Sequence, residues 1–254
     1  MRDDTGIGGR ADRFPATRDS AVLAAQSSDL LERERGLAIL VETYWKPAYK
    51  YLRLRFGESN EDAKDLTQGF FARAIEKDFF DGYDPARGSF RTYLRTCLER
   101  FAANEKKAAS RQKRSPGGAL LALDFANAES ELHREPVSAD RGPEDVFHDE
   151  FVRSLFALSI ERLREECLVR GKDLPYRLFE RYELDRDGDE KLSYERLAEE
   201  FHIPVTQVTN FLAFARREFR RIVLEKLREI TANDREFREE ARSLLGVGAG
   251  GVAP

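Results

Sequence analysis

The chain has 254 residues and a formal net charge of −4, and 41% of its residues are hydrophobic. This length allows one large domain or two small ones, and the modest apolar content favours two small cores. Two cysteines cannot build a disulfide framework, and the longest apolar run, Leu37 to Val41, is far shorter than the roughly 20 residues of a membrane span. Three histidines leave little material for a metal site, and the charged start Met1 to Asp4 is unlike a secretory peptide. We therefore expect a cytoplasmic protein with no membrane contact, no metal and no cofactor.

Nearly every segment has the apolar spacing of an amphipathic helix. Apolar residues recur at three- and four-residue steps, and no stretch keeps a clean alternation with a period of two. The sequence therefore predicts an all-α fold. Helices are expected over 20–56 with a break near 26–29, and over 61–77, 90–112, 144–170, 174–182, 193–201, 204–230 and 234–245.

The helices fall into two groups, which predicts two small helical domains joined by a flexible linker. Residues 19–114 form the first unit and residues 144–246 the second. Between them, residues 115–143 hold three prolines and many polar residues, with one apolar island at 120–125. The glycine-containing ends, 1–18 and 247–254, lack apolar periodicity and are expected to be disordered tails.

The helix over 61–77 has an acidic face opposite a broad apolar one. On a helical wheel Asp62, Asp65 and Gln68 lie together, away from the apolar arc. This face is either an ordinary solvated surface or a docking surface for a basic partner helix, with Gly69 allowing close approach. Thr67 falls inside the apolar arc, which argues against a phosphorylation switch at this residue.

The helix over 90–112 carries a stripe suited to single-stranded nucleic acid. An aromatic ring can stack on a base, an amide can read a base edge, and cations can contact phosphates. Tyr93 could equally be a residue at the boundary of the core. The members of this stripe are Tyr93, Arg100, Asn104, Lys107 and Arg111.

The segment from Leu192 to Arg221 predicts a helix-turn-helix. Ser193 can cap a short helix, His202 and Ile203 fit a tight turn, and Pro204 suits the first position of a second helix. A generic packing of two helices is the alternative. The outward residues of the second helix that could contact duplex DNA are Thr206, Gln207, Thr209, Asn210, Arg217 and Arg220.

Positive charge is concentrated in the same two places. Residues 90–114 hold eight Lys and Arg against two Glu, and residues 204–228 hold six against two. Two basic segments in an acidic chain indicate two docking faces for a polyanion, unless they are simply solvated helix faces.

With these motifs the sequence resembles a sigma factor of bacterial RNA polymerase, of the extracytoplasmic-function type within the sigma-70 superfamily. The resemblance covers about 19–113 and 144–230. Residues 61–71, EDAKDLTQGFF, resemble the part of region two that grips the polymerase clamp helices. Residues 90–94, FRTYL, resemble the helix that melts and reads the minus-ten element, and residues 194–217 resemble region four, which reads the minus-thirty-five element.

The resemblance implies a transcription initiation factor, not an enzyme, with core RNA polymerase and promoter DNA as partners. Asp62, Asp65 and Gln68 would contact polymerase, and the two stripes would contact the minus-ten strand and the minus-thirty-five duplex. An anti-sigma factor or a regulatory kinase would be a further partner of a factor of this kind. A helix-turn-helix regulator that does not bind core polymerase is the serious alternative.

The sequence departs from the family pattern at four positions. Tyr93 replaces the usual Trp, which keeps a stacking surface, and His202 takes the turn position usually held by Gly, where φ is positive. Ala213 and Phe214 lie where the family tends to show His and Arg, which weakens the phosphate grip in mid-helix.

The acidic run at 185–189 imitates a calcium loop but lacks the Gly and the bidentate Glu that such a loop needs, so we expect no calcium site.

Overall fold

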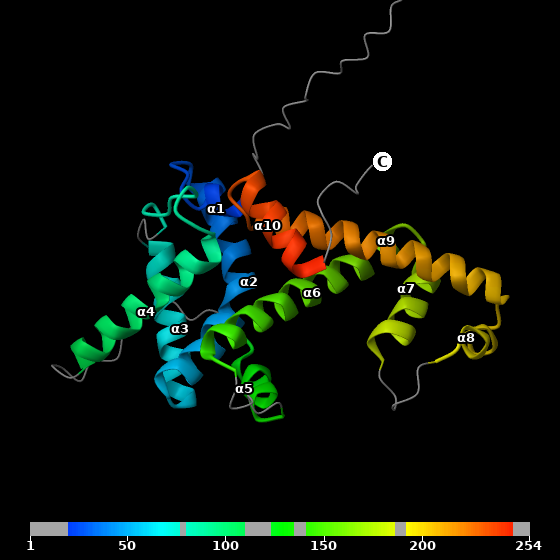
Figure 1. Ribbon diagram of the computed structural model, residues 1–254, viewed down its shortest axis with the longest axis horizontal. Helices are drawn as coiled ribbons and strands as arrows, with labels where there is room; N and C mark the ends of the chain where they lie inside the picture. Colours follow the sequence, from blue (N-terminus) through cyan, green and yellow to red (C-terminus); the bar gives the residue numbers. More distant parts are fainter. Residues whose placement is uncertain (1–19, 77–79, 110–122, 135–140, 186–191, 246–254) are drawn as a thin grey trace, which may run out of the picture.

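The computed structural model describes residues 20–76, 80–109, 123–134, 141–185 and 192–245 (Figure 1). Every regular element within these ranges is helical, so the all-α prediction is confirmed. The expected tails, residues 115–122 and 135–140 of the expected linker, and Arg111 lie outside the described residues. Among the described helices, none combines the length and the apolar character needed to cross a membrane.

The elements follow the predicted order, with one helix added between the two units. A single π-helical turn, η1 (Glu180–Leu184), extends α7. The helices are α1 (Ala21–Ala24), α2 (Leu30–Phe56), α3 (Asn60–Glu76), α4 (Phe90–Ala109), α5 (Phe125–Arg134), α6 (Pro143–Val169), α7 (Asp173–Phe179), α8 (Tyr194–Glu200), α9 (Val205–Glu229) and α10 (Asp234–Leu245).

Local capping explains where the helices of the first unit start and stop. The carboxylate of Asp29 accepts the backbone N–H groups of Leu31 and Glu32, so it caps α2. Gly57, with φ of 62°, ends α2 in the left-handed conformation that glycine adopts without steric cost. The Ser59 hydroxyl then accepts the backbone N–H of Asp62 at 3.1 Å and starts α3. The predicted break near 26–29 and the predicted end of the helix at residue 56 are both confirmed.

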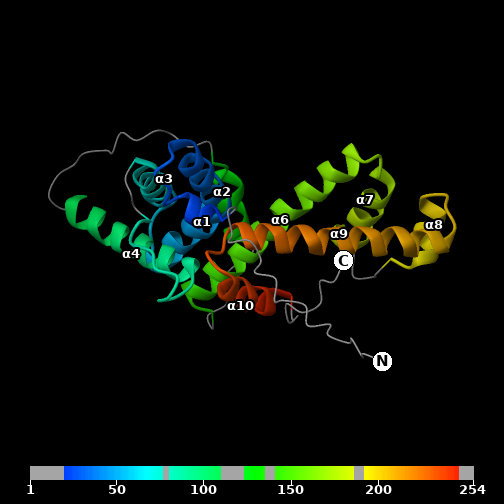
Figure 2. The same ribbon diagram turned by 90° about the horizontal axis from the view of Figure 1, so that it is seen from above.

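Helix α2 is the centre of the first core. Residues 49–52, which follow one another around the helix, are all buried, because α3, α5 and α6 pack on different sides of α2. Figure 2 shows α2 among α1, α3, α4 and α6. The core also takes residues from α6, α9 and α10; its largest members include Tyr44, Tyr49, Tyr51, Phe70, Phe71, Phe80, Phe90, Phe147, Phe151 and Phe237.

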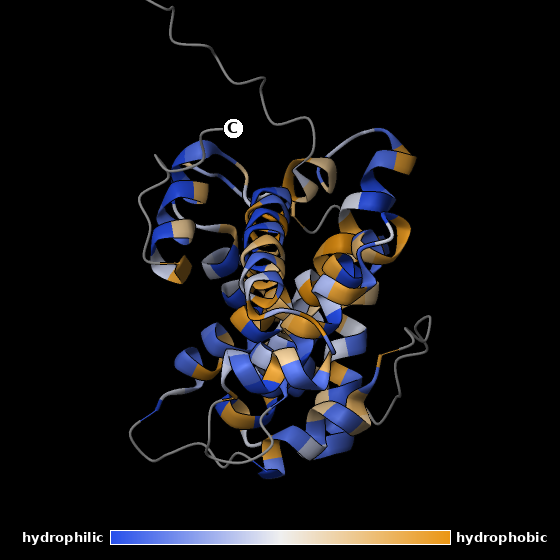
Figure 3. Ribbon diagram, turned by 90° about the vertical axis from the view of Figure 1, so that its right-hand side faces the viewer, coloured by the Kyte–Doolittle hydropathy of each residue, from blue (hydrophilic) through white to orange (hydrophobic). Residues whose placement is uncertain are grey.

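A second, smaller core lies at the far end of α6 and α9. The C-terminal part of α6 and the N-terminal part of α9 enclose α7 and α8 there. Figure 3 shows that the long helices carry orange and blue positions on the same ribbon, as helices with one buried face do. The buried residues of this core include Leu163, Leu178, Phe179, Leu197, Val208 and Leu212.

The two cores are connected more firmly than the expected flexible linker implies. Helices α6 and α9 each contribute to both cores, so they form a continuous two-helix connection (Figure 1). Residues 125–134, expected to be linker, form α5, and its Phe125 and Ala128 are buried. The apolar island at 120–125 was the signal for this contact, since an apolar run in a polar segment usually packs against something.

A buried lysine fixes α5 and α6 to α2. Lys50 is 2% exposed, and its ammonium lies 2.6 Å from Glu150 of α6 and 2.7 Å from Glu131 of α5. Removing such a charge from water is costly unless acidic partners surround it. Lys46, one turn earlier, also contacts Glu131 at 2.8 Å. These ion pairs fix where α5, a described part of the predicted linker, lies on the first core.

Candidate functional site

Helix α3 presents Asp62 and Asp65 to solvent and keeps its apolar side in the first core. Both acidic residues are exposed, Gln68 is partly buried, and Phe70 and Phe71 on the other side are buried. The Ser59 hydroxyl lies 2.6 Å from the Asp62 carboxylate, so Asp62 is also part of the helix cap. Asp65 has no such structural duty within the described residues, which makes it the cleaner candidate for a contact with a partner.

Two other residues of α3 face the core instead of a partner. Gly69 lies against Phe101 of α4, since a Cβ there would come within 3.4 Å of that ring. Gly69 is thus next to this chain's own α4, and the approach of a partner helix at Gly69 stays a prediction. Thr67 is fully buried and its hydroxyl donates to the Ala63 carbonyl at 2.7 Å, which confirms its predicted place inside the apolar arc.

Helix α4 holds the predicted stripe in two different environments. Arg100, Asn104 and Lys107 are exposed along the outer side of the helix. Tyr93 is only partly exposed, and its ring lies 5.3 Å from the ring of Tyr83 in the loop that precedes α4. Burial, together with a hydrogen bond to Cys97, raises the pKa of Tyr93 to about 12. The Tyr93 ring is thus held in place by the core and remains partly exposed.

A short helix, a turn and a long helix occur where the helix-turn-helix was predicted. Ser193 caps α8 by accepting the backbone N–H of Arg196 at 3.2 Å. His202 has φ of 54°, as expected for a residue in the glycine position of the turn. The Ile203 N–H donates to the Ala198 carbonyl at 3.0 Å and closes the turn, after which α9 begins.

The outer side of α9 carries the predicted contact residues. Val208, Leu212 and Ala215 face the second core. Ala213 is exposed and Phe214 is partly buried, so the middle of the outer face lacks a cation. The predicted contact residues are all exposed: Thr206, Gln207, Thr209, Asn210, Arg217 and Arg220.

Much of the positive charge in residues 204–228 is paired with acidic residues of the same chain. The count of charged residues in the sequence did not reveal this pairing. Arg216 contacts Glu183 at 2.6 Å, and Arg228 contacts Asp234 at 2.8 Å. Arg221 pairs with Glu166, Glu218 and Glu225. Arg217 has a long ion-pair contact of 3.7 Å to the neighbouring Glu218, lies over the Phe214 ring and remains 70% exposed.

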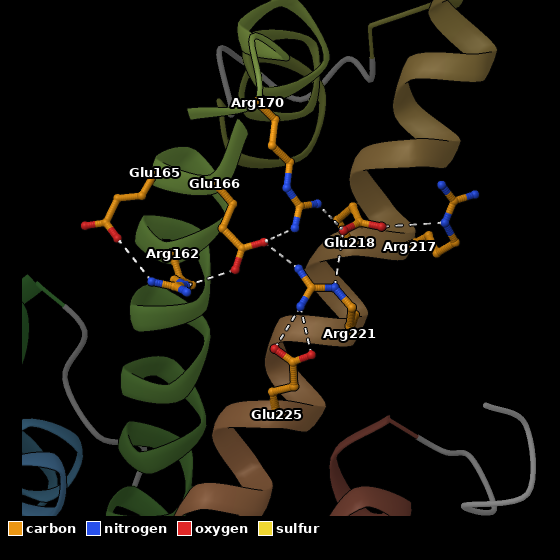
Figure 4. Close-up of polar contacts among 8 residues, drawn as sticks. All are labelled: Arg162, Glu165, Glu166, Arg170, Arg217, Glu218, Arg221 and Glu225. Atoms are coloured by element: carbon orange, nitrogen blue, oxygen red, sulfur yellow. Dashed lines mark hydrogen bonds and ion pairs between the residues drawn. The ribbon is translucent and has the colours of Figure 1, made fainter. Parts of the chain in front are cut away.

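An ion-pair network joins α6 and α9 beneath this face (Figure 4). Arg221 reaches Glu166 of α6 at 2.6 Å, and Glu225 and Glu218 of its own helix at 2.8 and 3.2 Å. Arg170, directly after α6, completes the ring by contacting both Glu218 and Glu166 at 3.3 Å. The arginine neighbours outweigh the effect of burial and hold the pKa of Glu166 below its usual range. The network fixes the second helix of the pair relative to α6.

These surfaces can now be compared with known proteins. Residues 40–112 match the family model of Sigma-70 region 2. The matched segment begins in α2, contains all of α3 and reaches past α4, so it holds both the acidic face and the Tyr93 stripe. The match shows that this part of the chain is similar to region 2 of sigma-70 factors. No curated protein and no solved structure matches the chain.

Proposed function

We propose that the chain is a transcription initiation factor of the extracytoplasmic-function type that binds core RNA polymerase in the cytoplasm and directs it to promoters. The observation that carries this proposal is the Sigma-70 region 2 match, which coincides with an exposed acidic face on α3 and an exposed polar stripe on α4. A second unit with an exposed polar helix, α9, supplies the other half of promoter recognition.

Each surface is assigned one task. Asp62, Asp65 and Gln68 contact a basic helical surface of core polymerase, where charge complementarity sets partner choice. The α4 stripe binds the opened minus-ten strand: Tyr93 stacks on a base, Asn104 reads an edge, and Arg100, Lys107 and Arg111 contact phosphates.

The first turns of α9 are assigned to the minus-thirty-five duplex. Thr206, Gln207, Thr209 and Asn210 reach base edges, and Arg217 and Arg220 reach phosphates two turns further on. The missing cations at Ala213 and Phe214 mean that this contact depends on those two arginines.

A helix-turn-helix regulator that does not bind core polymerase is the competing function, and the exposed outer side of α9 favours it. Such a protein would need the second unit but would have no use for the acidic face of α3. Co-purification with core polymerase separates the two functions, because only a sigma factor should bind.

Run-off transcription with core polymerase on a library of genomic fragments tests the proposal directly. Discrete transcripts that depend on the added protein are expected, and they would also supply the promoter sequence. The proposal would be overturned if the transcripts were the same with and without the protein and the protein also failed to bind the core enzyme.

A further inference from the structure

The C-terminal helix α10 is docked on the start of α4 by a buried carboxylate. Glu236 is 5% exposed, and its two oxygens accept the backbone N–H groups of Phe90 at 2.6 Å and Ala232 at 2.9 Å. The Tyr83 hydroxyl donates to the same carboxylate at 3.2 Å. A negative charge at a helix N-terminus is stabilised by the helix dipole. The contact ties α10 to a helix that lies 146 residues earlier in the chain.

Two further acids of α10 contact arginines. Glu240 is buried and contacts Arg91 at 3.0 Å. Asp234, at the start of the helix, contacts Arg228 at 2.8 Å. Although α10 has more acidic than basic residues, most of its negative charge is therefore used in internal contacts.

The solvent face of α10 consequently has the opposite sign. Arg235, Arg238 and Arg242 lie within an arc of about 60° on a helical wheel, opposite the buried arc that contains Phe237. All three arginines are exposed, and Glu239 is the acid at the edge of their stripe. Within the described residues, Arg238 and Arg242 have neither an ion-pair nor a hydrogen-bond partner. Two guanidinium groups are thus available to an external anion without breaking an internal contact.

The arginine stripe begins beside the proposed strand-binding surface. The Arg235 guanidinium donates to the Pro85 carbonyl at 2.9 Å, in the loop that precedes α4. Tyr83 of the same loop packs on Tyr93 at 5.3 Å. The stripe and Tyr93 are therefore linked through contacts to one loop, and the docking by Glu236 holds their relative position.

We infer that the outer face of α10 binds the phosphate backbone of duplex DNA, with Arg235, Arg238 and Arg242 extending the DNA surface of α4. Guanidinium groups match phosphate oxygens in geometry and charge, and exposed arginines without internal partners break no internal contact when they bind. The inference rests on the proposed function in taking this DNA to be the promoter next to the opened segment. It adds a contact that neither the minus-ten stripe nor α9 supplies.

The test compares two double variants of the full chain that lose the same charge. Arg238→Gln with Arg242→Gln removes two cations from the α10 stripe. Arg134→Gln with Arg164→Gln removes two exposed cations from α5 and α6 and serves as the matched control. Arg235 is left intact because it also contacts Pro85. Binding to a generic DNA duplex is measured by fluorescence anisotropy over a range of salt concentrations, without polymerase.

Each phosphate contact contributes a slope of about 0.9 to the fall of log affinity with log salt. The α10 variant should therefore lose about 1.8 from the slope, so that wild-type affinity falls about twelve-fold more than the variant's between roughly 50 and 200 mM salt. The control should keep the wild-type slope. An unchanged slope in the α10 variant, an equal loss in the control, or no duplex binding by the wild type would overturn the inference. Run-off transcription on wild type is scored separately, so that failure of the sigma assignment is distinguishable from failure of this contact.

Discussion

The indole of Trp45 in α2 stands edge-on to the ring of Phe125 in α5, with centroids 5.4 Å apart and an interplanar angle of 80°. Trp45 is the single tryptophan of the chain, so its fluorescence reports directly on whether α5 is docked. Beside this pair, Arg53 binds the Glu129 carboxylate with Nη2 at 2.6 Å. Intrinsic fluorescence can therefore follow a local event in a chain of many helices.

Acidification should undock α5. The hydrogen bonds from Arg53 hold the pKa of Glu129 below its usual range, and Lys46 and Lys50 outweigh the effect of burial to lower that of Glu131. For carboxylates with a lowered folded pKa, the stabilisation is complete above the unfolded value of about 4.3 and is lost as the pH falls through the folded value. We expect Trp45 emission to shift below about pH 4.3 while most helical circular dichroism remains.

A variant supplies the control for this titration. Glu129→Gln with Glu131→Gln should show the altered emission already at neutral pH and a flatter acid titration. If wild-type emission stays constant until the helical signal itself collapses, the carboxylates do not control the docking of α5.

Thr67→Asp should destabilise the protein by at least about 3 kcal/mol, because it places a charge at a fully buried position. Thr67 is fully buried, and its hydroxyl is already bonded to the Ala63 carbonyl. Thr67→Val keeps the shape and should cost no more than about 1 kcal/mol. Urea unfolding measures both values. Wild-type stability of Thr67→Asp, or more transcription from it, would show that a phosphate can be accommodated here.

Local features of the fold could be predicted from the sequence, whereas contacts between distant elements could not. Caps, breaks and the positive φ of His202 depend on a few neighbouring residues, and the helical pattern locates them. The docking of Glu236 on Phe90 joins residues 146 positions apart, and no periodicity specifies such a pair. A partial signal existed at Lys50, since a lysine flanked by buried tyrosines needs acidic partners.

The same distinction applies to the candidate surfaces. The positions of residues on a helical wheel predicted the exposed faces of α3 and α9, because burial follows the helical period. Counting charges overestimated the basic face of α9, because Arg221 and Arg216 are paired with glutamates from α6 and η1. Charge segregation in sequence predicts a docking face only where the partners of each charge are also known.

Asp65→Arg should weaken binding to core polymerase without unfolding the protein. Asp65 is exposed, so the unfolding free energy should change by less than about 0.5 kcal/mol. A desolvated ion pair with polymerase would make the loss in binding about 2 to 5 kcal/mol. Glu161→Arg on the exposed side of α6 makes the same change of charge and should bind core normally. Equal affinities of the two variants, measured by anisotropy with labelled protein, would remove the acidic face of α3 from the interface.

The last prediction separates the two nucleic-acid surfaces. Tyr93→Ala should remove stacking worth about 1 to 3 kcal/mol per base, so promoter opening should fail while binding of closed duplex survives. Tyr93→Phe keeps the ring against Tyr83 and should open promoters nearly as well, which distinguishes lost stacking from a disturbed core. Asn210→Ala with Arg217→Ala should weaken duplex binding and leave activity intact on a template that is already melted.

Permanganate footprinting on duplex and on bubble templates reads these outcomes, because permanganate attacks unstacked thymines. Tyr93→Ala should lose reactivity in the duplex even at protein concentrations that saturate binding. The α9 variant should lose it only at low concentration, since its defect is in binding and mass action can overcome it. As a control for folding, both variants must have the same midpoint of urea unfolding as the wild type. This control is needed because Tyr93 packs on the core and Arg217 lies over the Phe214 ring at 5.7 Å. Equal loss of opening and of duplex binding in both folded variants would contradict this division of tasks. It would mean that α4 and α9 act as one surface, coupled through the two cores that α6 and α9 share.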